Sequence, residues 1–224
     1  MLFRFLAERG SILINPAREL AVPAWGDEAL LVPPLEENEI TDLLDGLPRA
    51  SVKDLRNRLQ FELLYSCGLR LRESIRLNVG DVDLISKTLH VRDPKNGRDR
   101  EIPLMRGVMG ALQDYLALRR SLVRGPDNGA LLLSQAGKRL NVQTFGVWLR
   151  RLNHKCGKAA RRVYPHLLRH SIAVHLLRGG ADIRYVQEFL GHSNLDVTKT
   201  YLRLIPGRLK EDCDKAMPEI ALLH

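Results

Sequence analysis

The sequence predicts a mainly α-helical fold with one small antiparallel β-sheet, that is, an α+β protein. Three observations lead to this expectation. Apolar residues recur at helical spacing along most of the chain after residue 35. Between Val82 and Leu104 the pattern changes to short runs typical of β-strands. The 224 residues are 45% hydrophobic, which is ample for one large domain, or one domain with an appendage.

Turn residues divide the chain into its elements. Residues 1–34 are expected to be the remnant of a last helix plus a linker, because an apolar stretch over Leu2–Glu8 is followed by several prolines. Residues 35–224 then form the principal domain, in which Gly46 and Gly68 end helices and Pro165 suits the first turn of another. The helices expected in this domain cover residues 37–47, 52–66, 70–77, 108–122, 141–154, 165–178, 183–190, 194–202 and 207–216.

A hairpin is expected where the helical period is lost. Thr88–Val91 and Glu101–Leu104 are short β-type runs. The segment Asp93–Gly97 between them contains an Asn-Gly dipeptide, which favours a tight turn. We therefore predict a small antiparallel sheet around this turn.

Composition excludes several classes of protein. No apolar run approaches the roughly 18 residues that span a bilayer, and charged residues occupy the start of the chain where a signal peptide would be apolar. We expect a cytoplasmic protein with no membrane partner. Three cysteines without a C-x-x-C pair predict neither a disulfide framework nor a zinc site.

The net charge of +9 is concentrated in one part of the chain. Residues 128–181 contain no Asp or Glu, so their Lys and Arg residues are unbalanced. Such clustering favours binding to a polyanion with steep salt dependence, although a solvated basic face is the ordinary alternative. We predict double-stranded DNA as the partner. The candidate DNA-binding residues are Lys138, Arg139, Arg150, Arg151, Lys155, Lys158, Arg161 and Arg162.

The segment PHLLRH contains a candidate anion site. His166, Arg169 and His170 are three and four residues apart, so they are expected to share one face of a helix while Leu167 turns towards the core. An imidazole beside a guanidinium favours phosphate between them. Taken alone, a satisfied surface pair explains this spacing as well.

The segment GHSNLDVTKTY follows some twenty residues later. Gly191 fits the position just after a helix, and Ser193 with Asp196 fits a capping box for the next helix. His192 then lies in the turn, and Tyr201 lies two turns along the next helix. A tyrosine has a pKa near 10 and is a poor nucleophile unless cations favour its phenolate. A core tyrosine beside a turn histidine is the alternative.

Arg70 and Lys95 complete an ordered set with these residues. Arg70 follows the helix-ending Gly68, and Glu73, one turn on, can orient it; Lys95 lies at the expected hairpin tip. In chain order the set reads Arg, Lys, His, Arg, His, Tyr. With YSCGLRLRES, HLLRH and LGHSNL, this order and spacing resemble the tyrosine recombinase family, which includes phage lambda-type integrases and Xer-type resolvases. The resemblance covers about residues 35–217.

The resemblance implies the fold of a recombinase catalytic domain and a role for each residue. Tyr201 would attack a DNA phosphate and form a 3′-phosphotyrosyl link, which makes the chain a site-specific recombinase that needs no metal and no cofactor. Arg70 and Arg169 would hold the non-bridging oxygens, and Lys95 would protonate the departing 5′-oxygen. His166 would accept or position the tyrosyl proton, and His192 would bond the phosphate.

Three alternative functions remain open, and the C-terminal tail leads to an expectation about oligomerisation. A non-catalytic helix-turn-helix reader would use residues 183–202. A type IB topoisomerase-like enzyme would share the nucleophile, and a truncated remnant would be inactive. In the resembling family an apolar tail docks on a neighbouring protomer. The stripe of Leu209, Cys213, Ala216 and Met217 therefore favours a homo-oligomer, a tetramer assembled on DNA, with packing of the tail on its own domain as the alternative.

Overall fold

The computed structural model describes residues 32–92, 99–155 and 162–191. The chain divides into two units, Met1–Pro33 and Pro34–His224, and the described helices and strands all belong to the second. The predicted N-terminal helix, the hairpin tip and the two predicted C-terminal helices lie outside the described residues. Within the described part, no helix is long and apolar enough to cross a membrane.

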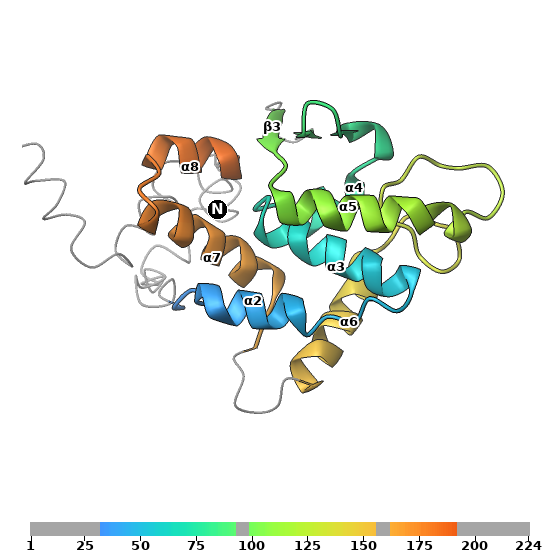
Figure 1. The fold of residues 1–224 in the computed structure, drawn as a ribbon, viewed down its shortest axis with the longest axis horizontal. Helices are drawn as coiled ribbons and strands as arrows, with labels where there is room; N and C mark the ends of the chain where they lie inside the picture. The colour runs from blue at the N-terminus through green and yellow to red at the C-terminus, as the bar shows by residue number, and fades with distance from the viewer. Residues whose placement is uncertain (1–31, 93–98, 156–161, 192–224) are drawn as a thin grey trace, which may run out of the picture. The chain divides into compact units, whose positions relative to one another are not determined.

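Helices make up most of the second unit, with a three-stranded sheet at one edge of it (Figure 1). The expected fold class is therefore confirmed, and the bounds of two helices, α7 and α8, are the predicted ones. The elements in chain order are α2 (Glu37–Asp45), α3 (Val52–Tyr65), α4 (Leu71–Arg76), a 3₁₀ turn (Val79–Asp81), β1 (Val82–Asp83), β2 (Thr88–Val91), β3 (Arg100–Pro103), α5 (Arg106–Arg119), a second 3₁₀ turn (Arg120–Leu122), α6 (Val142–Lys155), α7 (Pro165–Arg178) and α8 (Ile183–Leu190).

The sheet is antiparallel in the order β1-β2-β3. Leu89 of β2 lies opposite Ile102 of β3, and Val91 lies opposite Arg100. Because alternate side chains of a strand share one face, the buried Ile102 places Arg100 on the inner face of β3. The strand begins one residue earlier than the sequence indicates, and this residue is Arg100.

Helix α3 is the centre of the core. It packs against α5 and α7, and Leu59, Phe61, Leu63 and Leu64 on it are fully buried. Ser51 caps its first turn by accepting from the Asp54 amide, while Asp54 accepts from the Ser51 amide. Because α3 is buried around most of its circumference, it serves as a fixed support for the surrounding helices.

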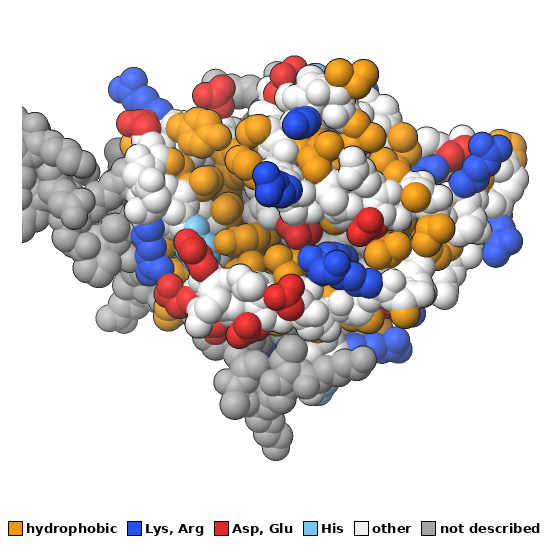
Figure 2. Space-filling view, in the orientation of Figure 1, with side chains coloured by type: hydrophobic (Ala, Val, Ile, Leu, Met, Phe, Trp, Pro, Cys, Tyr) orange, Lys and Arg blue, Asp and Glu red, His pale blue; other side chains and the backbone are white. Residues whose placement is uncertain are grey.

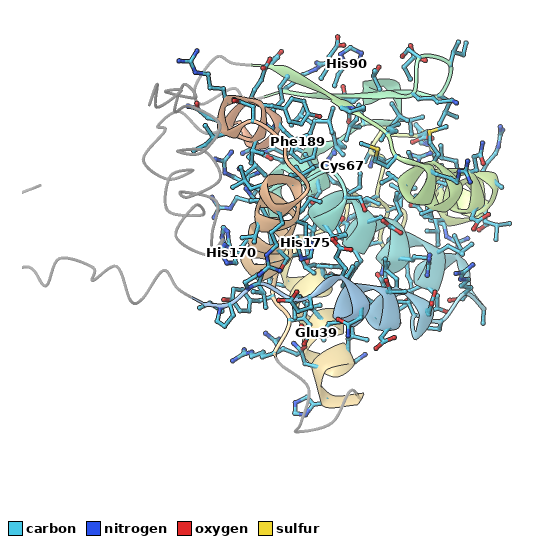
Figure 3. The ribbon with its side chains drawn as sticks, turned by 60° about the vertical axis from the view of Figure 1, so that its left-hand side comes forward. Glu39, Cys67, His90, His170, His175 and Phe189 are labelled. Carbon is cyan, nitrogen blue, oxygen red and sulfur yellow. The ribbon has the colours of Figure 1, made fainter. Side chains whose placement is uncertain are left out.

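Gly68 lets the chain turn sharply between α3 and α4. Its φ is +58°, in the left-handed region that favours glycine. A Cβ at this position would also lie 2.8 Å from Leu190 Cδ2 and 3.0 Å from Phe189 Cε1. The end of α8 therefore packs directly on this turn, and Figure 3 shows Phe189 of α8 close to Cys67. The predicted helix end at Gly68 is thus also a close contact between two elements.

Candidate functional site

Arg70 lies at the N-terminal cap of α4, just after the Gly68 turn. Its backbone amide donates to Glu73 Oε2 at 2.9 Å, and its Nη1 donates to Glu73 Oε1 at 2.7 Å. The side chain is 37% exposed, so the guanidinium is fixed by the carboxylate but still reaches solvent. Glu73 orients Arg70 in the way that the sequence suggests.

Arg169 lies on the inner side of α7, only 5% exposed. Its Nη1 donates to the Gly68 carbonyl, its Nη2 donates to the Leu190 carbonyl at 2.6 Å, and Nη1 lies 3.9 Å from Glu73 Oε2. The expectation that Arg169 shares one face of the helix with His166 and His170 stays a prediction, and the three side chains differ in burial: Arg169 is buried, His170 is half-buried and His166 is exposed. α7 is buried around most of its circumference, so its apolar residues do not define a single inner face.

Arg100 is the site residue that the sequence pattern did not reveal. It begins β3, is 6% exposed, and donates from Nη2 to Glu73 Oε2 at 2.9 Å. The signal that could have found it is the strand period of two, which places Arg100 on the same face as Ile102. An arginine on the inner face of a hairpin needs a buried acceptor, and Glu73 provides it.

Glu73 is therefore shared by three guanidinium groups. Burial alone would raise the pKa of this carboxyl group, but the charge and hydrogen bond of Arg100, with the hydrogen bonds from Arg70, outweigh burial and lower the pKa. One negative charge faces Arg70, Arg100 and Arg169, so the cluster carries a formal excess of two positive charges. A site of this kind favours an anion where it opens to solvent, which is at Arg70.

The three arginines also hold one helix end. Each donates to a different carbonyl group of three consecutive residues at the end of α8, where carbonyl groups have no partner within the helix. Gly191 follows in the left-handed conformation with φ +65°, as the sequence predicts. The Phe189 carbonyl accepts from Arg100 Nε at 3.1 Å, the Leu190 carbonyl from Arg169 Nη2 at 2.6 Å, and the Gly191 carbonyl from Arg70 Nη2 at 3.4 Å.

The remaining candidates differ in what the structure describes. His166 is exposed on the first turn of α7, and His170 is half-buried one turn further on (Figure 3). Lys95, His192 and Tyr201 lie outside the described residues. Two other histidines that the sequence assigns no catalytic role have local partners, since His90 pairs with Glu101 and His175 Nδ1 lies 2.9 Å from Tyr65 Oη.

The basic stretch contains two kinds of residue. The side chains of Lys138, Arg150, Arg151 and Arg162 are exposed, as a DNA-binding role requires. Arg139 is different: its guanidinium donates to three backbone carbonyl groups at the end of α4 and to Asn78, so it serves as a cap for that helix. The side chain of Lys155, and Lys158 and Arg161 altogether, lie outside the described part.

Acidic and basic side chains are concentrated on different helices of this unit. In Figure 2 acidic side chains gather over α2, whose sequence ENEITDLLD contains no basic residue. The basic residues of α6 come from a stretch that contains no acid. Arg151 of α6 lines the same cavity as Glu39 and Asp42 of α2. A polyanion would be repelled by the acidic side chains of α2 and attracted by the basic ones of α6. Among the residues that the structure describes, no group of three His, Cys, Asp or Glu side chains could hold a metal ion.

Comparison with known proteins shows the family to which the chain belongs. Residues 34–207 match the family described as the phage integrase family. The chain is 38% identical to the tyrosine recombinase XerC of Chromobacterium violaceum over 216 residues, which cover 96% of this chain and 70% of that protein. It is 34% identical to XerD of Corynebacterium glutamicum over 213 residues, covering 94% of this chain and 69% of that protein.

Solved structures give the same result for the fold. The crystal structure of XerA recombinase matches with a TM-score of 0.68 and 34% identity, over 83% of this chain and 65% of that one. XerH recombinase bound to palindromic difH substrate matches with a TM-score of 0.67 at 24% identity, over 81% of this chain and 52% of that one, which supports the fold alone. The chain thus spans about two thirds of XerC, XerD and XerA and about half of XerH, and by sequence and by fold it belongs to the phage integrase family of tyrosine recombinases.

Proposed function

We propose that this chain cleaves and rejoins double-stranded DNA at specific sites through Tyr201. The observation that best supports this proposal is the Glu73 cluster, which consists of Glu73, Arg70, Arg100 and Arg169. Three guanidinium groups share one carboxylate and hold the helix end that leads into GHSNLDVTKTY. A non-catalytic DNA reader would have no use for an excess of buried positive charge at this place. Phosphoryl transfer does, because negative charge grows on the phosphate in the transition state.

The proposed reaction is a transesterification. Tyr201 Oη forms a bond to the phosphorus while the bond from phosphorus to the 5′-oxygen breaks. His166 accepts the tyrosyl proton, and Lys95 donates a proton to the departing 5′-oxygen. The 3′-phosphotyrosyl ester conserves the energy of the phosphodiester, so a 5′-hydroxyl of a second strand can attack it without metal or nucleotide.

Arg70 and Arg169 are proposed to act from different depths. Arg70 reaches solvent and would bind a non-bridging oxygen directly, with its direction set by Glu73. Arg169 lies beneath it, and its charge would stabilise the five-coordinate phosphorus from the floor of the site. His192, directly after Gly191, would donate a hydrogen bond to the same phosphate.

The test is covalent capture on a nicked duplex from which the cleaved strand cannot be religated. Incubated with duplexes carrying candidate sites, the protein is expected to form a 3′-linked adduct visible by denaturing gel. Tyr201→Phe should lose the adduct completely and keep DNA affinity within about twofold, since only one hydroxyl is removed. Tyr185→Phe is the matched control, because Tyr185 is an exposed tyrosine on α8. Adducts that persist in Tyr201→Phe, or vanish equally in Tyr185→Phe, contradict the assignment.

We also propose that the active form is a tetramer on DNA, joined through the tail from Gly207 onward. The apolar stripe of that tail supports this, as does an open cavity of about 570 Å³ between α2 and α6, lined by Leu43, Leu47 and Trp148. Removing residues 207–224 should weaken assembly on DNA, followed by gel shift, more than it lowers the melting temperature. Equal losses would indicate a tail packed on its own domain.

A further inference from the structure

Arg100 differs from an ordinary structural arginine in how its nitrogens are satisfied. Its Nε and Nη2 donate to the Phe189 carbonyl and to Glu73, but its buried Nη1 has no acceptor within the described part of the chain. An unpaired buried donor costs about 1 to 3 kcal/mol. The fold alone therefore gives an incomplete account of why a guanidinium occupies this position.

The position of Nη1 indicates what the group does. A Cβ built on Gly191 would lie 2.8 Å from Arg100 Nη1 and 3.1 Å from its Cζ, so the guanidinium packs against the backbone of Gly191. Gly191 is where α8 ends with positive φ, and the next residue is His192. Arg100 thus contacts this turn twice, through the Phe189 carbonyl and through Gly191.

Arg100 also joins three elements that are distant in sequence. It comes from β3, bonds Glu73 of α4, and bonds the end of α8, which packs against β3. Through Glu73 Oε2 it shares an acceptor with the Arg70 amide. A planar guanidinium can bridge two fixed acceptors in this way, whereas a lysine ammonium is a single point donor on a flexible stem.

We propose that Arg100 is a positioning residue for strand cleavage. It fixes the Phe189–Gly191 turn against Glu73, and so sets the course of the chain towards His192 and Tyr201 relative to Arg70. This inference rests on the proposed function for its consequence, but the fixing of the turn is a property of the protein without DNA. The two parts can therefore be tested separately.

The first test measures hydrogen exchange of the intact, DNA-free protein. Arg100→Met keeps an unbranched side chain about as long as the arginine stem and removes the guanidinium with both hydrogen bonds, so the amides at the end of α8 should exchange about tenfold faster or more. Arg100→Lys should fall between wild type and Arg100→Met. The control is Arg119→Met, which removes an equally buried arginine that bonds Asp127 and backbone carbonyl groups at another place. Unchanged exchange at residues 183–191 in Arg100→Met would overturn the inference.

The second test separates positioning from general destabilisation. In single-turnover cleavage normalised to the folded fraction, Arg100→Met should be roughly 10- to 100-fold slower with DNA affinity within about threefold, because misplaced reacting groups lose rate more than binding. Arg119→Met should cleave at the wild-type rate after normalisation. Equal normalised losses in the two variants would reduce Arg100 to a stability effect and reject its positioning role.

A third comparison identifies the group that Arg100 positions. A substrate with sulfur in place of the bridging 5′-oxygen has a leaving group that needs no proton. It should rescue Lys95→Ala but leave Arg100→Met slow, because the latter defect lies on the nucleophile side. Rescue of Arg100→Met would show that it acts through the hairpin lysine and would refute the proposal. If the wild type forms no adduct, the proposed function fails, while the exchange experiment still decides whether Arg100 fixes the turn.

Discussion

Two sites in this chain combine buried arginines with one carboxylate and several backbone carbonyl groups, but they differ in net charge. At the end of α5, Arg119 donates to both oxygens of Asp127 and to the carbonyl groups of Ala130 and Leu131. This clamp has one guanidinium for one carboxylate and is neutral. The Glu73 cluster has three guanidinium groups for one carboxylate. Both sites hold backbone carbonyl groups in place, but only the Glu73 cluster has an excess of positive charge. This excess favours an anion at the cluster, whereas the neutral Arg119–Asp127 pair only fixes a loop.

The carboxylates give the largest expected difference between the two sites. Glu73→Gln leaves three buried or half-buried guanidinium groups without a counter-charge, so the free energy of unfolding should fall by about 3 kcal/mol or more. Asp127→Asn should have a much smaller effect, because the Asp127 side chain is 46% exposed and water replaces it. Urea denaturation at pH 7 measures both. Equal losses of unfolding free energy in the two variants would mean that Glu73 stabilises the fold no more than Asp127 does.

The pH dependence of the same pair sharpens the test. Because the folded-state pKa of Glu73 lies below the ordinary 4.5, its contribution is complete above pH 4.5 and is lost as the pH falls through the lower folded-state value. The pKa of Asp127 is lowered to about 2, chiefly by its hydrogen bond to Arg119, so its contribution disappears between pH 3.8 and about 2. Melting curves against pH should therefore become flatter below pH 4.5 in Glu73→Gln, whereas Asp127→Asn changes the curve only below pH 3.8.

Glycines near the two sites give the next difference. Gly68 and Gly125 both have positive φ, but a Cβ at Gly68 would meet the end of α8, whereas nothing lies within 4 Å of one at Gly125. Gly68→Ala should lower the free energy of unfolding by about 2 to 4 kcal/mol through backbone strain and overpacking. Gly125→Ala should show the backbone part alone, about 1 to 2 kcal/mol. Similar values from thermal or urea unfolding would show that the α8 contact yields easily.

The smallest expected effect concerns the basic stretch, where exposed arginines are compared with Arg139, whose guanidinium already bonds backbone carbonyl groups. Arg150→Ala and Arg151→Ala should each reduce the slope of log affinity against log salt by up to about 1 and leave stability nearly unchanged. Arg139→Ala should do the reverse, because its guanidinium caps α4. Fluorescence anisotropy on arbitrary duplex across a salt series measures the slopes. A lower slope in Arg139→Ala at full stability would return this residue to the DNA-binding group.

The sequence predicted the helices better than it predicted the inside of the site. α7 and α8 have the predicted bounds because Pro165 and Gly191 mark their ends through local backbone chemistry. Arg70 with Glu73 was also found, since the two residues lie within one helical turn. These successes depend on neighbours along the chain, which spacing can reveal.

Long-range contacts account for what spacing could not reveal. Arg100 joins the cluster across 27 residues to Glu73 and 89 residues to Phe189, so no local pattern indicates its role. The spacing of HLLRH indicated that Arg169 shares a helix face with His166 and His170, but it could not indicate how deeply Arg169 is buried. Its burial depends on carbonyl groups from the Gly68 turn and from α8, which only the folded chain brings together. Strand β1 (Val82–Asp83) was not predicted, because a strand of two residues is too short to show an alternating pattern.

The three carbonyl groups at the end of α8 are consecutive, so the arginines that bond them do not respond one by one. A small rotation of this turn would lengthen all three bonds together and free one donor group on each arginine, while their contacts with Glu73 and the Gly68 carbonyl remain. An incoming backbone oxygen of DNA would offer a new acceptor. The carbonyl groups of the turn and an anion bound at Arg70 would then compete for the same donors, so the end of α8 and the arginine cluster would respond to each other cooperatively.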